Sequence, residues 1–185
     1  MAWTCLNRFV EMRSPWLTVI GENWRDDQQQ RLEYWRVEKA DSLIILPKLG
    51  DRLLLPPKMY RPGIDQYTLD FPGGRLPLGK HPAEMIPQIL QRELNLSPSA
   101  IGSLTALNPD GWAVNSSFSN QKVYGYLVEI LQTEYPQTDD LALSYALTPA
   151  GLDALLTDLT CLQCRALLLE YLLKAGFYFP GNSWT

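Results

Sequence analysis

The side chains with the clearest chemical use lie in residues 67–96, YTLDFPGGRLPLGKHPAEMIPQILQRELNL. Carboxylates can bind a divalent cation or carry a proton, and cationic side chains can bind a phosphate. Four charged residues of this segment are candidates: Lys80, Glu84, Arg92 and Glu93. The residue pattern predicts a strand over 67–71, a Pro-Gly-Gly turn at 72–74, a second turn at 77–79 and a helix from about residue 82. The four candidates therefore lie on this helix or just before it.

One proline disturbs the predicted helix. Pro87 falls inside it, whereas proline is tolerated in the first turn of a helix and costs about 3 kcal/mol further in. We therefore expect the helix to start late, near Glu84, or to be kinked.

The segment resembles the Nudix box, the strand-loop-helix signature of the Nudix hydrolases. That pattern runs glycine, five residues, glutamate, seven residues, Arg-Glu, an aliphatic, any residue, Glu-Glu, any residue, glycine, aliphatic. Aligned from Gly74 without gaps, the frame is kept at these positions: Gly74, Gly79, Pro82, Glu84, Leu90, Glu93 and Leu96. Most of the chemically important positions differ. Lys80 stands where the pattern has its first glutamate, and Gln88 and Ile89 stand in place of Arg-Glu. Arg92 replaces the first glutamate of the Glu-Glu pair, and Asn95 replaces the closing glycine.

The resemblance implies a metal site that these substitutions remove. The family's glutamates lie at i, i+3 and i+4 on one helix face, where they hold magnesium or manganese while water attacks a pyrophosphate. Here that face reads Ile89, Arg92, Glu93. We therefore expect that no metal binds here. Glu93 is the remnant of the catalytic cluster, and it is the expected ligand if a metal does bind. Glu84 is the second candidate catalytic carboxylate.

Other parts of the chain resemble the ADP-ribose pyrophosphatase branch of this family. Residues 58–62, KMYRP, resemble the Gln-Tyr-Arg segment before the box, so Arg61 is a candidate phosphate contact; a salt bridge to Asp65 or Asp70 is the equal alternative. The resemblance also makes the backbone at Gly73 and Gly74 a candidate ligand contact. Lys80 and Arg92, with Arg61, could bind a phosphate without metal. Alternatively, Arg92 pairs with Glu93 or Glu84 on the helix surface.

The N-terminal region and a later loop complete the resemblance. Predicted strands at 16–20 and 32–37, with a polar loop at 23–30 between them, match strands that help form a dimer in the ADP-ribose branch. Trp35 or Tyr34 could clamp an adenine there, or these rings could pack on the sheet. In the loop that commonly supplies a glutamate to the attacking water, Gln121 is the candidate ligand contact.

Composition bounds the class of protein. The chain has 185 residues, 46% of them hydrophobic, which suits one domain, with residues 1–40 as a strand extension of the body formed by 41–185. A net charge of −4 and no basic run argue against nucleic-acid binding. No apolar stretch is long enough for a membrane span, and the N-terminus does not predict a signal peptide, so we expect a cytoplasmic protein.

The Cys161-x-x-Cys164 pair lies in an apolar run with no second pair, and we interpret both thiols as core residues in preference to a redox or zinc site.

The remaining elements of the body are predicted from local patterns. A buried strand is predicted at 42–46, further strands at 52–55, 103–107 and 122–130, and helices at 149–159 and 161–175. Residues 134–140 read as an acidic linker, and the aromatic tail, 177–184, as a docked segment or a partner surface.

The predicted fold is a Nudix α/β/α sandwich with a mixed sheet and an N-terminal strand extension. The resemblance implies a protein of the ADP-ribose or nucleoside-diphosphate-sugar type with weak or lost hydrolysis, which binds a nucleotide metabolite without a cofactor or serves as an interaction module, as a homodimer. One alternative is an active hydrolase that holds Mg²⁺ or Mn²⁺ on relocated ligands such as Asp70, Glu84 and Glu93. Another is a scaffold without a ligand. Whether the chain is an enzyme stays open at this point.

Overall fold

The computed structural model describes residues 2–135 and 142–177. Most of the predicted acidic linker and all but the first residue of the aromatic tail lie outside these ranges. No described helix has the length and apolar character needed to cross a membrane.

The described part of the body is built on a seven-stranded mixed sheet. Its strands are β4 (Ser42–Leu49), β5 (Arg52–Leu55), β8 (Gly73–Arg75), β9 (Ile101–Ala106), β10 (Trp112–Ala113), β11 (Lys122–Ile130) and β12 (Leu143–Ala146). The order runs β10-β11-β4-β5-β12, with β8 beside β4 and β9 beside β11. β4 and β11 are parallel, and the other pairs are antiparallel. A short hairpin of β6 (Met59–Arg61) and β7 (Gln66–Thr68) lies apart from this sheet.

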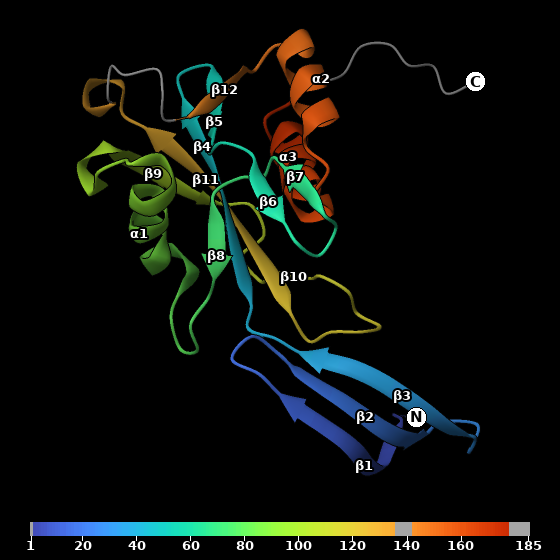
Figure 1. The fold of residues 1–185 in the computed structure, drawn as a ribbon. Coiled ribbons are helices and arrows are strands. Elements are labelled where there is room, and N and C mark those ends of the chain that lie inside the picture. The colour runs from blue at the N-terminus through green and yellow to red at the C-terminus, as the bar shows by residue number, and fades with distance from the viewer. Residues whose placement is uncertain (1, 136–141, 178–185) are drawn as a thin grey trace, which may run out of the picture.

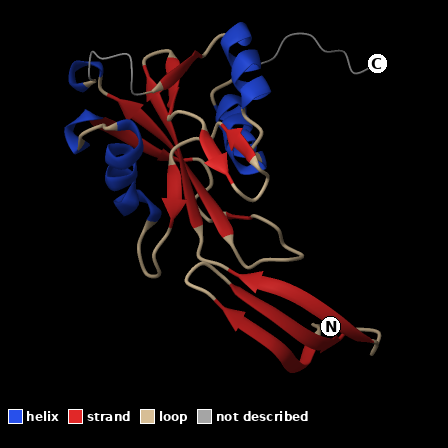
Figure 2. Ribbon diagram, in the orientation of Figure 1, coloured by secondary structure: helices blue, strands red, loops and turns tan. Residues whose placement is uncertain are grey.

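Helices cover both faces of the sheet, as Figures 1 and 2 show. They are α1 (Pro82–Leu94) on one side, α2 (Pro149–Asp158) and α3 (Leu162–Lys174) on the other, with 3₁₀ turns at Pro98–Ala100 and Gln132–Glu134. Strand β4 is buried on both faces, as its apolar run predicts. Leu43 and Ile45 join the core under α1, while Ile44 and Leu46 join the core under α2 and α3. The alternation of side chains along one strand thus supplies two hydrophobic layers.

The box segment folds differently from its prediction at two places. Residues 69–71 are not strand, and Gly73 and Gly74 form part of β8, where a turn was predicted. A Cβ at Gly73 would lie 2.6 Å from the Leu43 carbonyl oxygen, so glycine serves here to let two backbones approach. The turn predicted at 77–79 is confirmed, since Gly79 has φ of 78°.

Of the two expectations for the box helix, the late start near Glu84 is wrong, and the kink stays a prediction. α1 begins at Pro82, and Pro87 lies inside it. His81 caps the helix by accepting from the Ala83 amide, and the Glu84 carboxylate accepts from the His81 amide. This reciprocal capping box satisfies amides of the first turn and fixes the start despite the proline.

The N-terminal residues form an arm that projects from the body (Figure 1). It is an antiparallel sheet of β1 (Thr4–Arg13), β2 (Thr18–Arg25) and β3 (Arg31–Glu38). The sequence did not indicate β1, and β2 continues through residues 23–25, where a loop was predicted. The reason is that ion pairs, rather than an apolar face, cover one side of the arm.

Glu22 is the centre of those ion pairs. Its side chain is 3% exposed and accepts from Arg36 Nε at 2.9 Å, Arg8 Nε at 3.1 Å and the Trp24 indole at 3.1 Å. The Arg36 hydrogen bonds, followed by those of Arg8 and Trp24, hold the pKa of Glu22 below its ordinary value despite burial. A buried carboxylate is stable only with such partners.

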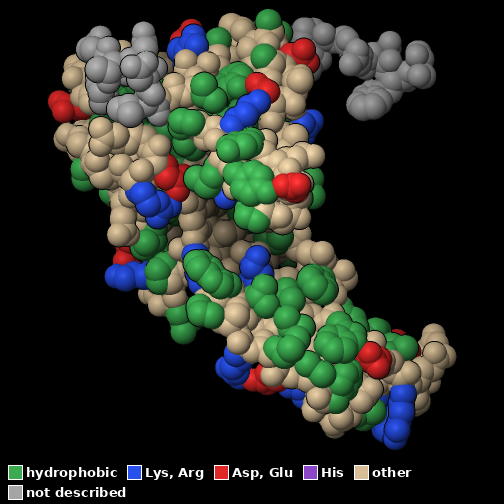
Figure 3. All heavy atoms as spheres, in the orientation of Figure 1, with side chains coloured by type: hydrophobic (Ala, Val, Ile, Leu, Met, Phe, Trp, Pro, Cys, Tyr) green, Lys and Arg blue, Asp and Glu red, His purple; other side chains and the backbone are tan. Residues whose placement is uncertain are grey.

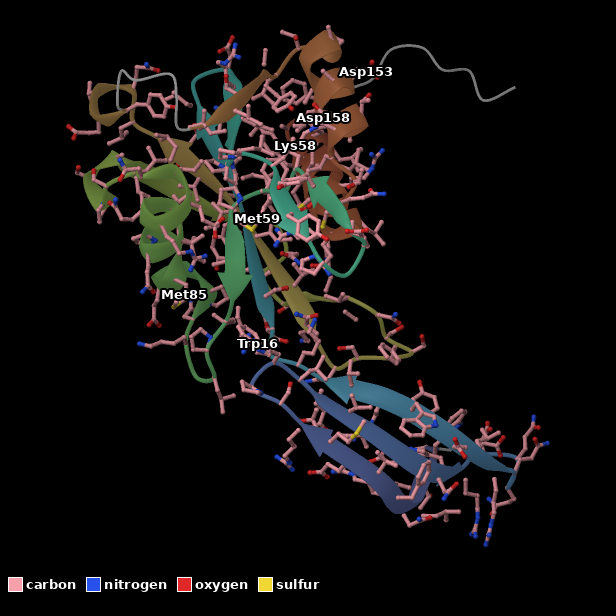
Figure 4. The ribbon with its side chains drawn as sticks, in the orientation of Figure 1. Trp16, Lys58, Met59, Met85, Asp153 and Asp158 are labelled. Atoms are coloured by element: carbon pink, nitrogen blue, oxygen red, sulfur yellow. The ribbon has the colours of Figure 1, made fainter. Side chains whose placement is uncertain are left out.

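The arm joins the body through its last strand and its first turn. The Val37 amide donates to the Phe118 carbonyl at 2.8 Å. Near the β1–β2 turn, the Arg75 guanidinium lies 4.5 Å above the Trp16 ring, and Figure 4 labels Trp16 where arm and body meet. The arm is therefore tied to the loop before β11 and to β8, next to the box segment.

Candidate ligand-binding site

A pocket of about 880 Å³ lies between β4, β8, the β6–β7 hairpin and the start of α3. This volume is within the range typical of small-molecule sites, about 300–1,000 Å³. Figure 3 shows the surface hollowed near the middle of the molecule, beside that hairpin. Of the sequence candidates, it is lined by Arg61, Gly73, Gly74 and Glu93.

Glu93 is held at the pocket by Gly73 of β8. Its Oε2 accepts from the Gly73 amide at 3.1 Å, and its Oε1 pairs with the Arg92 guanidinium. The same guanidinium donates to the Gly73 carbonyl at 2.9 Å. Glu93 therefore fastens α1 to β8, and both of its oxygens already have donors.

Magnesium or manganese does not fit this part of the site. Ile89, which occupies a family ligand position, is 2% exposed and packs in the core under α1. Arg92 brings a positive charge to the second position and pairs with the one carboxylate that is left. A hard dication needs several oxygen ligands, and this helix face offers only Glu93, already bonded.

The relocated ligand set of the hydrolase alternative is not formed either. Glu84 caps α1, and the hydrogen bond from the His81 backbone, followed by the Lys80 ammonium, lowers the pKa of its carboxyl group. Within residues 2–135 and 142–177, one group of three His, Cys, Asp or Glu side chains has its ligand atoms within 4.8 Å of one another, and Glu84 and Glu93 are not in it. That group is Asp70, Cys161 and Cys164.

Arg61 lies at the pocket in an ion pair with Asp70, the partner given as an alternative in the sequence prediction. Arg61 Nε donates to Asp70 Oδ2 at 3.0 Å, and its Nη2 donates to the same oxygen at 2.5 Å. The guanidinium side chain is nevertheless 45% exposed, so its remaining donors face solvent and the pocket.

Lys80 does not join Arg61. Lys80 lines a second, smaller cavity of about 410 Å³, and its Nζ lies 3.3 Å from Glu84 Oε2. Arg92 pairs with Glu93, as one sequence alternative predicts. Lys80 and Arg61 line different cavities, and each of the three cations has a carboxylate partner, so a single phosphate site formed by Lys80, Arg92 and Arg61 stays a prediction.

The remaining candidates, Trp35 and Gln121, lie away from the main pocket. Trp35 packs edge-on against Phe9 across Gly21 in the arm, with ring centroids 5.5 Å apart, and is 43% exposed. The Gln121 amide donates to the Ala40 carbonyl at 3.0 Å and so fixes the linker between arm and body.

The sequence prediction missed Lys39 at the main pocket. It lines both cavities from the linker after β3, and among the described residues its ammonium group has no ion-pair or hydrogen-bond partner. A single lysine in a polar linker gives no signal in the sequence, because its position follows only from the path of the chain between arm and body.

The two cysteines at α3 also line the pocket. Cys164 is buried in the core, as predicted, but Cys161 is the N-cap of α3 and half-buried. The hydrogen bond between the two sulfurs lowers the pKa of Cys161 and raises the pKa of Cys164, which burial raises further. Their position at a helix start, rather than inside a helix, gives them access to the pocket.

Comparison with known proteins supports the fold. No protein-family model and no curated protein matches the chain. Among solved structures, the chain is similar to one described as an ADP compounds hydrolase, with a TM-score of 0.73 and 23% identity over 95% of this chain and 97% of that one. This likeness confirms the predicted fold. The chain has the Nudix α/β/α sandwich with a mixed sheet and an N-terminal strand extension.

Proposed function

We propose that the chain binds a nucleotide-type metabolite of the ADP-ribose or nucleoside-diphosphate-sugar class in the main pocket, and that magnesium- or manganese-dependent hydrolysis is weak or lost. The observation that carries the proposal is the composition of this pocket, which has cationic groups at its rim and a single, fully bonded carboxylate from the box helix. The Lys39 and Arg61 rim of such a pocket suits a phosphate better than a hard dication such as Mg²⁺.

The pocket offers each part of such a ligand a matching surface. The unpaired Lys39 ammonium and the exposed donors of Arg61 suit a diphosphate, because charge-assisted hydrogen bonds to phosphate are strong. Met59, Ile64 and Phe71 supply apolar wall for a base or sugar face. The ADP compounds hydrolase of similar fold supports ADP-containing compounds as the first ligands to test.

Replacing Arg61 by Met should weaken ADP-ribose binding roughly ten- to a hundredfold, because one charge-assisted contact is worth about 1.5–3 kcal/mol. Calorimetry on the parent and on Arg61→Met measures the change. Lys58→Met is the matched control. This variant removes a neighbouring cation that pairs with Asp158 at 3.0 Å and does not line the pocket. Figure 4 labels both Lys58 and Asp158. Equal affinities for parent and Arg61→Met would remove Arg61 from the binding site.

We also propose that two copies of the chain form a homodimer through this N-terminal arm. Its visible face carries a group of hydrophobic side chains (Figure 3), and Phe9, Met12 and Trp35 are each more than 40% exposed. A contiguous exposed apolar patch is typical of an interaction surface.

Removal of residues 1–40 is expected to convert the dimer to a monomer. Because β4 begins at Ser42, this deletion leaves the strands of the body intact. Light scattering at micromolar concentration measures the mass of both proteins. The double variant Phe9→Ser, Trp35→Ser is the finer test, since it changes the same face without shortening the chain. A parent that is monomeric at this concentration would remove the dimer from the proposal.

A further inference from the structure

The Asp70, Cys161 and Cys164 group lies on the wall of the same pocket, and the only member that touches a proposed phosphate contact is Asp70, which pairs with Arg61. All three ligand atoms lie within 4.8 Å of one another, and Cys164 Sγ is 4.0 Å from Asp70 Oδ1. The cysteines come from the first turn of α3, and the aspartate from the segment after β7. The fold therefore brings Asp70 next to two cysteines that follow it by 91 and 94 positions in the chain.

Asp70 is oriented by its neighbours. Its Oδ2 accepts from Thr68 Oγ1 at 3.0 Å and from Arg61, while its Oδ1 faces the Cys164 thiol. Hydrogen bonds of this kind to one oxygen are typical of carboxylates that bind metal through the other. The three bonds to Oδ2 fix the carboxylate and leave Oδ1, which faces the Cys164 thiol, for a metal.

We propose that Cys161, Cys164 and Asp70 bind one soft divalent cation of the Zn²⁺ type. Zinc takes thiolate sulfur at about 2.3 Å and carboxylate oxygen at about 2.0–2.2 Å, so tetrahedral ligands lie roughly 3.5–4 Å apart. The observed spacing is close to this and needs only small rotations of the side chains. Thiolates select zinc over magnesium, which separates this site from the Mg²⁺ or Mn²⁺ chemistry of the fold.

The ligand count and access also suit zinc. Three protein ligands leave a fourth position, and all three residues line the pocket, so that position opens to solvent and to a small molecule. Three groups that can each carry negative charge so close together repel one another unless they are protonated or share a cation. A disulfide between the two sulfurs is the competing fate, but it gives no role to Asp70 Oδ1, the oxygen that faces Cys164 and not Arg61.

The test is Co²⁺ titration of the full chain after chelation and thiol reduction, followed by Zn²⁺ competition. We expect one Co²⁺ per chain, with a thiolate-to-cobalt charge-transfer band in the near ultraviolet and the intense visible bands of a tetrahedral site. Zn²⁺ should displace the cobalt. Cys161→Ser and Asp70→Asn should each weaken Zn²⁺ binding at least tenfold, and Cys161→Ser should also reduce the charge-transfer band. Cys5→Ser, which changes the exposed thiol on the arm, is the matched control and should leave both unchanged.

Circular dichroism checks that each variant is folded, and Asp70→Asn keeps the test open if a cysteine variant fails to fold. Fully reduced, folded protein that shows no charge-transfer band overturns the proposal. A band that survives Cys161→Ser and Asp70→Asn, or that disappears in Cys5→Ser, overturns it as well. Failure to take up cobalt together with formation of a Cys161–Cys164 disulfide in glutathione disulfide would assign the pair to redox chemistry instead. None of these readings depends on nucleotide binding.

Discussion

Purified protein is expected to hydrolyse ADP-ribose with Mg²⁺ or Mn²⁺ roughly a thousandfold or more slowly than an enzyme of this fold with a complete carboxylate cluster. A catalytic metal lowers the barrier by several kcal/mol, and each 1.36 kcal/mol is tenfold in rate. Here Ile89 is buried in the core and Arg92 neutralises Glu93, so the helix face cannot hold the metal. The rate of AMP and ribose phosphate release measures the effect.

The Glu93→Gln variant tests whether the slow rate depends on the carboxylate that remains in the box helix. Glu93→Gln should leave the slow rate unchanged, because Glu93 serves as an acceptor for the Gly73 amide and for Arg92 rather than as a metal ligand. A hydrolase with the complete carboxylate cluster, run in parallel, shows that the assay works. Robust turnover that is abolished by Glu93→Gln would contradict the proposal and favour an active hydrolase.

Gly73→Ala is expected to destabilise the fold by about 1–3 kcal/mol, whereas Gly74→Ala should be nearly neutral. The Cβ of an alanine at 73 would lie 2.6 Å from the backbone oxygen of Leu43, which cannot move without breaking the β4–β8 pairing. At Gly74 the nearest atoms are 3.5 Å away, which is ordinary contact. Two adjacent glycines of the same strand thus serve as test and control.

Thermal unfolding measures this difference. For a chain of this size, 1 kcal/mol corresponds to roughly 2–4 °C in Tm, so Gly73→Ala should unfold several degrees lower than Gly74→Ala. Gly73→Ala should also weaken ligand binding, because the Gly73 amide and carbonyl hold Glu93 and Arg92 in place. Equal Tm values for the two variants would show that β8 can shift away from β4 at little cost.

The sequence predicted most of the body because its signals are local. The apolar run at 42–46 predicts β4, and the helices predicted at 149–159 and 161–175 correspond to α2 and α3; each prediction follows from a pattern within a few residues. The arm was only partly predicted. Glu22 is buried by long-range pairs with Arg8 and Arg36, so its strand carries no apolar alternation to read.

The site was harder to predict because its residues meet only in three dimensions. Arg61, from the segment before the box, and Glu93, from the box, both line the pocket, and their roles there stay predictions. Lys80 lines the second cavity, and its position in the box does not indicate which cavity it faces. The position of Lys39 at the pocket depends on the path of the linker between arm and body. The approach of Asp70 to Cys164 depends on how the start of α3 packs near β7.

The most direct test of the binding proposal is calorimetry of ADP-ribose with the full chain in EDTA and, separately, in Mg²⁺. The proposal predicts a micromolar Kd, about 8 kcal/mol, that is the same in both solutions, because Lys39 and Arg61 contact the diphosphate directly. Binding that requires Mg²⁺ would contradict it and favour a metal-dependent hydrolase, and the absence of heat in both solutions would leave the chain as a scaffold without this ligand.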